Sequence, residues 1–322
     1  RPAPECPRPP AVLPLTLGRG GTFDLRVRKR GRVAGCASPQ GLFPEETKYA
    51  CSGDFGTQAR CDGAERPMKD TRYVAAVRRG CRADLGFGTN AYAFDQGLGL
   101  RQCSPLTAYE WILCPIGGEQ VMRWRPERQN RSGVEASKRF RVTNNCDEPV
   151  WVKVEGLRPG VVFNEALVRR IAAGGSYTYA IPDRGLPGTR FVPKTGCDDR
   201  GGDCLLESAP PCPAGGCDIP VETKFEASWG CMYATGDRTR DAAQCATTEQ
   251  GIPSSYQDWW AGSVVDGWTL PFTVLVDDGG RGLTPGDTAR GGRGPDICRP
   301  VVCAGLRADT LCPQDELLTP EA

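Results

Sequence analysis

Cysteine is the reactive residue type that dominates this sequence, which has 17 cysteines and no histidine among its 322 residues. The absence of histidine excludes serine–histidine catalysis and histidine-ligated metal centres. A zinc site built from four cysteines is compatible with the composition. However, so many cysteines in a chain that does not begin with methionine are typical of a mature secreted protein. We therefore expect disulfide bridges, no metal, no cofactor and an extracellular location.

Aromatic side chains gather in one part of the sequence and could bind sugars. The stretch contains Trp229, Tyr256, Trp259, Trp260 and Trp268. An aromatic face beside polar groups suits stacking on a sugar ring. Alternate residues of a strand point to opposite faces, however, so at least half of these side chains are expected in a core. Both roles, sugar stacking and core packing, stay open at this point.

The segment that carries a glycosylation signal is polar and basic and contains glycine. Residues 118–137 have the composition of an exposed linker, and Asn130-Arg131-Ser132 is an N-glycosylation sequon. Charge and hydropathy exclude two other classes of partner. The net charge of +1 gives no field for nucleic acid. No apolar run is long enough for a membrane span.

The sequence predicts β-strands in the stretch that holds most of these aromatic side chains and near the start of the chain. Residues 258–271 alternate apolar or small residues with polar ones, and Asp266-Gly267 is a tight-turn dipeptide. The stretch therefore predicts a strand, a turn and a second strand. Residues 22–30 alternate in the same way and predict an edge strand whose charges face water. With 41 glycines and 28 prolines, the chain is expected to be rich in turns and poor in helix.

The stretch 258–271 also resembles the signature strand of thaumatin-like proteins, D-[FY]-[FYW]-D-x-S-x-[VI]-D-G-[FY]-N-[LIV]-P, in about nine of fourteen positions. Other segments are similar to motifs of the same family. Residues 139–146 resemble its first strand, residues 188–197 its G-R-[IF]-W-x-R-T-G-C motif, and residues 110–115 its closing Y-x-V-x-F-C-P motif. The resemblance covers about nine-tenths of the chain.

These motifs occur in a reversed order. The resemblance implies a mainly β, thaumatin-like antiparallel β-sandwich with disulfide-rich loop subdomains, circularly permuted into one domain. Residues 1–117 would be the family's carboxyl-terminal half, 118–137 a linker joining the ancestral termini, and 138–322 the amino-terminal half. The last part would hold a small disulfide loop region at 195–221 and an inserted loop at 230–256. Because the family's termini are tied by a disulfide, a short linker can join them.

The resemblance also implies the cysteine pairs. They are Cys114–Cys146, Cys197–Cys204, Cys212–Cys217, Cys103–Cys298, Cys81–Cys303, Cys51–Cys61, and Cys36 with either Cys6 or Cys312. Cys231 and Cys245 have no family counterpart and are expected to close the inserted loop. One cysteine of 17 is then left over, Cys6 or Cys312. Its thiol is expected either to be free or to form a bridge between two molecules in an assembly.

Thaumatin-like proteins have a cleft lined by one arginine and four acids. Carried over, the arginine is Arg190, and three of the acids are Glu226, Asp266 and Asp95, whereas Ala261 replaces the fourth. Because tryptophans cluster in sequence around these acids, we expect the binding cleft to hold Trp259, Trp260 and Trp268 as well. Glu226 and Asp266 would be the catalytic carboxylates of a hydrolase, since glycoside cleavage needs two. A structural ion pair between Arg190 and Glu226 or Asp266 is the alternative.

Three functions follow from these features. We favour a secreted thaumatin-like glycoprotein that binds carbohydrate or has a structural role in an extracellular matrix, wall or appendage. Its partners would be a β-glucan-like glycan or extracellular proteins. The alternatives are a defence-type β-1,3-glucan hydrolase and a proteinaceous inhibitor of a secreted hydrolase. The missing acid at Ala261 weighs against an enzyme.

Overall fold

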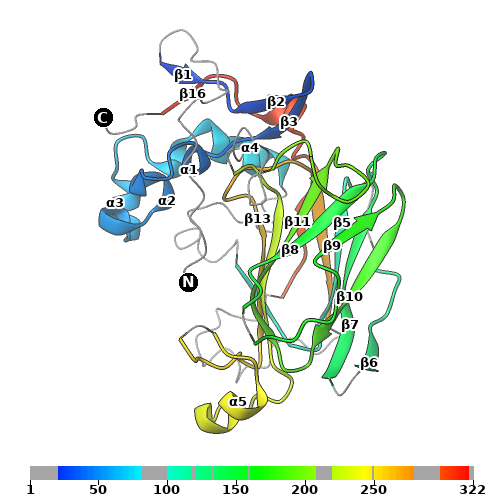
Figure 1. The fold of residues 1–322 in the computed structure, drawn as a ribbon. Helices are drawn as coiled ribbons and strands as arrows, with labels where there is room; N and C mark the ends of the chain where they lie inside the picture. Colours follow the sequence, from blue (N-terminus) through cyan, green and yellow to red (C-terminus); the bar gives the residue numbers. More distant parts are fainter. Residues whose placement is uncertain are drawn as a thin grey trace.

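Two six-stranded β-sheets form the body of the protein in the computed structural model (Figure 1). The structure describes residues 21–81, 100–117, 121–131, 134–158, 160–207, 220–248, 250–278 and 298–318. The sheet that we call the β12 sheet has the strand order β4 (Arg101–Cys103), β13 (Asp258–Ser263), β12 (Lys224–Trp229), β11 (Leu186–Thr195), β8 (Val150–Glu155) and β9 (Val168–Ile171). All of its strand pairs are antiparallel.

The other sheet, which we call the β7 sheet, joins early and late parts of the chain. Its strand order is β10 (Ser176–Pro182), β7 (Val134–Asn144), β5 (Ala108–Leu113), β14 (Phe272–Asp277) and β15 (Val301–Cys303), and β6 (Glu127–Arg131) also pairs with β7. Strand β5 therefore lies between two strands from beyond the linker. In the β12 sheet, β4 pairs with β13 in the same way. The segment before residue 118 thus contributes a strand to each sheet.

Two expectations about this region need correction. The pair β5–β7 is parallel, so the sandwich is not wholly antiparallel. Parallel neighbours require a return segment between them, and β6, antiparallel to β7, is part of that return. The segment predicted as a linker thus carries β6 and the start of β7.

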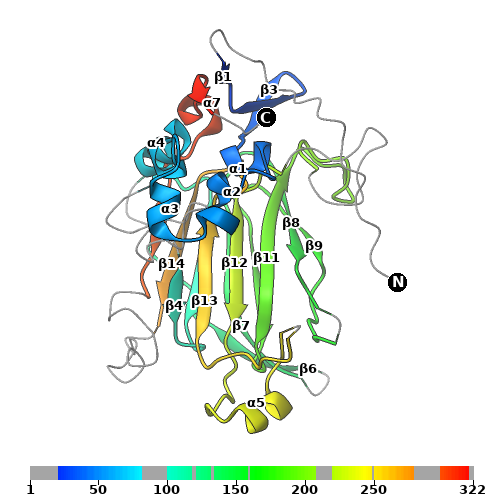
Figure 2. The same ribbon diagram turned by 90° about the vertical axis from the view of Figure 1, so that its left-hand side faces the viewer.

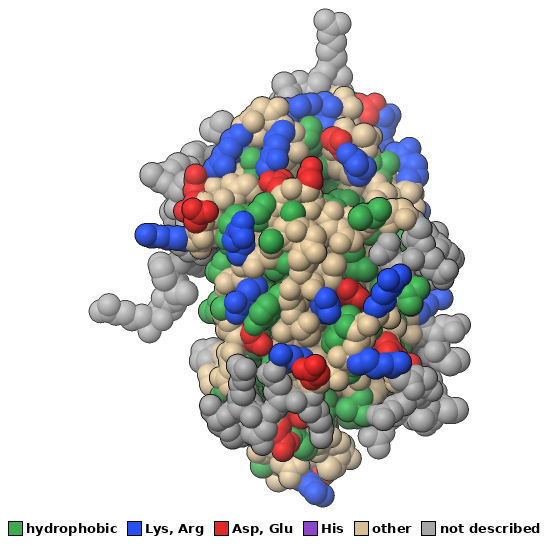
Figure 3. All heavy atoms as spheres, turned by 90° about the vertical axis from the view of Figure 1, so that its right-hand side faces the viewer, with side chains coloured by type: hydrophobic (Ala, Val, Ile, Leu, Met, Phe, Trp, Pro, Cys, Tyr) green, Lys and Arg blue, Asp and Glu red, His purple; other side chains and the backbone are tan. Residues whose placement is uncertain are grey.

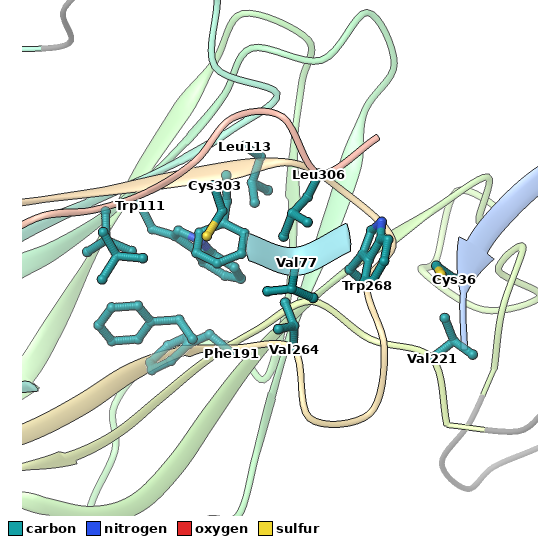
Figure 4. Packing of buried hydrophobic residues seen from close by; sticks show 14 of the residues in the cluster. Cys36, Val77, Trp111, Leu113, Phe191, Val221, Val264, Trp268, Cys303 and Leu306 are labelled. Carbon is teal, nitrogen blue, oxygen red and sulfur yellow. The ribbon is translucent and has the colours of Figure 1, made fainter. Parts of the chain in front are cut away.

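Large aromatic side chains fill the space between the sheets. Phe140 of β7 lies 4.4 Å from Phe225 of β12, and Tyr109 of β5 lies 5.5 Å from Trp260 of β13, measured between ring centroids. The core continues from Trp111 and Phe191 toward Trp268 without interruption (Figure 4). The sheets consequently form a sandwich, and the expectation of a mainly β fold is confirmed.

A helical segment covers one end of the sandwich, and an inserted loop lies at the other end (Figure 2). The helical segment comprises α1 (Pro39–Leu42), α2 (Thr47–Ala50), η1 (Gly53–Phe55), α3 (Gln58–Asp62), η2 (Met68–Asp70) and α4 (Arg72–Gly80). The inserted loop contains α5 (Arg238–Gln244), and α7 (Ala308–Leu311) comes late in the chain. Val77 of α4 and Leu306 pack beside Trp268, so the helical segment shares the core of the sandwich (Figure 4).

Short strands near both ends of the described chain form two small sheets. β1 (Thr22–Phe23) pairs with β16 (Glu316–Leu317), and β2 (Arg26–Lys29) pairs with β3 (Arg32–Cys36). The single edge strand expected over residues 22–30 is therefore wrong. Leu25 separates its two halves, because its backbone N–H donates to the carbonyl of Pro313 instead of continuing either ladder.

Seven disulfide bridges connect the fourteen described cysteines. They are Cys36–Cys312, Cys51–Cys61, Cys81–Cys303, Cys103–Cys298, Cys114–Cys146, Cys197–Cys204 and Cys231–Cys245. Each of them is a pair expected from the sequence, and Cys36 takes Cys312 as its partner. Four of them join residues before position 118 to residues after position 137. Cys6, Cys212 and Cys217 lie outside the described residues.

Candidate functional site

A row of four side chains crosses the outer face of the β12 sheet. Arg190 lies directly opposite Glu155 of β8 and directly opposite Glu226 of β12, which in turn faces Ala261 of β13. Their chain neighbours Phe191, Phe225 and Trp260 point into the core. Strand alternation therefore turns the whole row outward. Figure 2 shows this face of the sheet, with the helical segment at its upper end.

Trp259 is an exposed aromatic residue on this outer face. It is 36% exposed, lies directly opposite Ser228, and is two residues from Ala261. Ser228 is fixed in place because its hydroxyl accepts a hydrogen bond from the backbone N–H of Gly188 at 3.1 Å. The small Ala261 leaves space between the indole of Trp259 and the charged end of the row. An aromatic face thus lies beside polar groups on one open surface.

The charged residues of the outer face are arranged in ion pairs. Nε of Arg190 lies 3.3 Å from Oε1 of Glu226, and both side chains are partly exposed, by 51% and 34%. The ion pair expected as the structural alternative thus forms, with Glu226 as the partner. Nearer the helical segment, Lys194 binds Glu222 at 2.6 Å.

Asp266 is paired with Lys224 rather than with Arg190. Lys224 and Asp266 are more buried than Arg190 and Glu226, with 7% and 22% of their side chains exposed. Burial works against the charged form of Lys224, but the neighbouring carboxylates, Asp266 first, raise the pKa of the lysine above its usual value. The turn holding Asp266 needs Gly267, whose φ is +94° and whose missing Cβ leaves room for the carbonyl oxygen of Cys36.

Sequence reasoning missed Glu155, Lys194, Glu222 and Lys224. Burial, and after it the negative charge of Glu222, raises the pKa of Glu155 above its usual value. The alternation Val152-Lys153-Val154-Glu155 was a usable signal, because it places the charged residues of this strand on one face. Nothing in that pattern, however, indicates which strand lies opposite.

Two of the tryptophans assigned to the cleft are core residues, which corrects the assignment. Trp260 is 1% exposed and stacks on Phe225 with centroids 5.5 Å apart. Trp268 is fully buried, and its ring centroid lies 5.0 Å from that of Tyr73. Of the strand, turn and second strand expected over residues 258–271, the first strand is β13, which ends at Ser263. The second strand is wrong, because after the turn Trp268 makes only an isolated bridge with Cys36. This bridge holds Trp268 beneath the helical segment.

Asp258 anchors the strand that carries Trp259. The carboxylate of Asp258 is completely buried and accepts hydrogen bonds from the Arg139 guanidinium, from the Tyr109 hydroxyl at 2.8 Å and from the backbone N–H of Gly230 at 2.7 Å. Asp258 thus connects β13 to both central strands of the opposite sheet and to the first residue of the inserted loop. The backbone before Trp259 is consequently held at one position.

Two further expectations lie partly or wholly outside the described residues. Asp95, assigned to the cleft, is not among them. Asn130 is part of strand β6, but its side chain and Ser132 of the sequon are not described.

The outer face of the β7 sheet differs from that of the β12 sheet in how its charged side chains are distributed. Figure 3 views the molecule from this side, and positive and negative side chains are interspersed over it with no extended area of one sign.

None of the described helices is long and apolar enough to cross a membrane. No protein-family model matches the sequence, and no curated protein matches it.

Proposed function

We propose that this is a secreted, thaumatin-like protein that binds a neutral β-glucan-like glycan on the outer face of the β12 sheet. The observation that carries the proposal is the partly exposed indole of Trp259 on the same face as the Arg190–Glu226 ion pair, with the small residues Ala261 and Ser228 as their neighbours in the sheet. A pyranose ring on the indole would place its hydroxyls within reach of a guanidinium donor and a carboxylate acceptor.

The pairing of the charges favours binding over cleavage. A glycosidase needs one carboxylic acid that holds a proton and one ionised carboxylate. Glu226 and Asp266 are instead each held in an ion pair with a different cation, Arg190 and Lys224 respectively. Ala261, directly opposite Glu226, supplies no further carboxylate to the row. The balanced charges also suit an uncharged ligand.

The disulfide bridges support the thaumatin-like and extracellular parts of the proposal. Bridges of this number are typical of proteins that fold in an oxidising compartment. Apart from Cys231–Cys245, their pairing agrees with the pairing that the resemblance implies, including the bridges that join the two segments in reversed order. The alternative pairing of Cys36 with Cys6 is not the one found.

The experiment is a comparison of binding to laminarin, a soluble β-1,3-glucan, between the wild-type protein and Trp259→Ala. Loss of an aromatic stacking contact is worth about 1–2 kcal/mol, so the dissociation constant should rise roughly 5- to 30-fold. Calorimetric titration measures this change. Trp124→Ala is the matched control, because Trp124 lies on the outer face of the other sheet, near Arg141.

The outcomes separate the parts of the proposal. If the wild-type protein binds neither laminarin nor another neutral β-glucan, the proposed function is wrong. If it binds but both tryptophan variants bind equally well, the glycan lies elsewhere on the molecule. Release of reducing sugar by the wild-type protein and its loss in Glu226→Gln would identify a hydrolase instead.

A further inference from the structure

One guanidinium lies between two carboxylates on the outer face of the β12 sheet. Arg190 is directly opposite Glu155 on one side and directly opposite Glu226 on the other. Directly opposed residues of an antiparallel pair have Cβ atoms about 4.5–5.5 Å apart, which is well within the reach of an arginine side chain. Either carboxylate can therefore bind the same guanidinium without any change in the backbone.

The structure holds Arg190 in one of these two positions. Its Nε lies 3.3 Å from Oε1 of Glu226, whereas Glu155 makes no ion pair with any described residue. Half of the Arg190 side chain is exposed, which leaves room for a change of rotamer. Glu155 is less accessible, because it is half-buried and lies near Lys194 and Lys224 of the same face.

The other cations around Glu155 already have partners, which are carboxylates for the three lysines and a tryptophan ring for the arginine of β9. The charged groups that face Glu155 come from its own strand and from neighbouring ones: Lys153 of β8, Arg190 and Lys194 of β11, Lys224 and Glu226 of β12, and Glu222 before β12. Strand β9 contributes Arg170, whose guanidinium lies over the ring of Trp151. Lys153 binds Glu207, Lys194 binds Glu222, and Lys224 binds Asp266. Among these cations, half-exposed Arg190 is therefore the one that can respond to a new negative charge on Glu155.

We propose that Arg190 is a two-position switch, bound to Glu226 when Glu155 is protonated and drawn to Glu155 when Glu155 is ionised. Burial and the charge of Glu222 raise the pKa of Glu155, which brings the change of state closer to neutral pH. Movement of Arg190 leaves the exposed Glu226 without its cation. The switch needs no ligand, so it does not depend on the proposed glycan binding.

The test is an NMR titration of the intact, disulfide-bonded protein that follows the Nε–H signal of Arg190 and the carboxyl carbons of Glu155 and Glu226. In the wild-type protein we expect the Arg190 signal to shift with the same midpoint as the Glu155 carboxyl. In Glu155→Gln the Arg190 signal should stay constant over that pH interval. In Glu226→Gln the competing carboxylate is gone, so the pKa of Glu155 should fall.

Glu148→Gln is the control, because Glu148 is an exposed glutamate paired with a different arginine, Arg32. This substitution should leave all three signals unchanged. The proposal is overturned if the Arg190 signal ignores the titration of Glu155, or if it shifts equally in Glu155→Gln. Should Glu155→Gln fail to fold, the second variant decides alone, since an unchanged pKa of Glu155 in Glu226→Gln also overturns the switch.

Discussion

Arg139 and Asp258 form an ion pair that is enclosed between the sheets, with 1% and 0% of their side chains exposed. Arg139 reaches the interior because the register between β7 and β10 shifts at this residue, leaving it without an opposite partner. A β-bulge of this kind lets two successive residues, Arg139 and Phe140, point inward. The guanidinium also lies 4.8 Å from the Trp229 ring. Burial opposes the charged form of Arg139, but Asp258 raises its pKa above the usual value.

Replacing Arg139 by Met should destabilise the protein by about 3–5 kcal/mol, because Asp258 would remain buried without its cation. The double variant Arg139→Met with Asp258→Asn should lose less, since no uncompensated charge remains. Urea unfolding of both variants measures the free energies. Arg32→Met, which breaks an exposed pair with Glu148, should cost about 0–1 kcal/mol. A loss of that small size for Arg139→Met would contradict this account of the pair.

The orientations of Trp259 and Trp260 could be predicted only in part from the sequence. Alternation along residues 258–263 predicts that these neighbours point to opposite faces, and the structure places them so. The sequence does not say which face is the core, because that depends on the partner sheet. The burial of Trp268 could not be predicted from the sequence, since it depends on contacts with Tyr73 and Cys36 from the other segment of the chain.

At the scale of elements, helix α4 is stabilised from the far end of the chain. Backbone N–H groups of Arg72 and Tyr73 donate to the carboxylate of Glu316 at 3.1 and 2.7 Å, and the Thr71 hydroxyl accepts from Val74. Free N–H groups of a helical first turn require such acceptors. Strand β16 is in turn held by β1, so this cap ties the helical segment to both ends of the described chain.

The cap at Glu316 should make the stability of the protein depend on pH. Burial raises the pKa of Glu316 above 4.5, against the opposing effect of its backbone hydrogen bonds. A raised pKa means that the folded state favours the protonated acid. The contribution of Glu316 to the free energy of unfolding is therefore fully present below the pKa of this group in the unfolded state. It is lost as the pH rises through the pKa of Glu316 in the folded state. Glu316→Gln keeps an acceptor but cannot ionise, so its stability relative to wild type should increase between about pH 4 and pH 7.

Thermal unfolding across this pH range checks the cap prediction. Glu316→Ala removes the acceptor altogether and should be less stable than Glu316→Gln by about 1 kcal/mol at every pH. If the stability of Glu316→Gln relative to wild type falls as the pH rises, the assigned direction of the pKa shift is wrong.

Elements differed in how well local sequence predicted them. The strand over residues 258–263 was predictable because its alternation is long and rich in aromatics. The division of residues 22–30 into β1 and β2 was not, because it depends on the distant Pro313. Strand β6 was missed because its sequence is polar throughout and its pairing with β7 depends on backbone hydrogen bonds rather than on an apolar face.

At the scale of the whole molecule, two segments that are distant in sequence complete the same sandwich. Strand β5 lies between β7 and β14, and β4 pairs with β13, so neither sheet is complete without residues before position 118. Composition alone indicates only a loop-rich, disulfide-bonded protein with little helix. The expectation that the segments share one sandwich came from a family resemblance, and the pairing of β5 and β7 now gives it a physical basis.

Mass spectrometry of peptides from a digest without reduction tests this central claim most directly. We expect the peptides containing Cys36, Cys81, Cys103 and Cys114 to be linked to those containing Cys312, Cys303, Cys298 and Cys146, respectively. If these cysteines are instead bridged only within residues 1–117 or only within residues 138–322, the two segments do not form one sandwich.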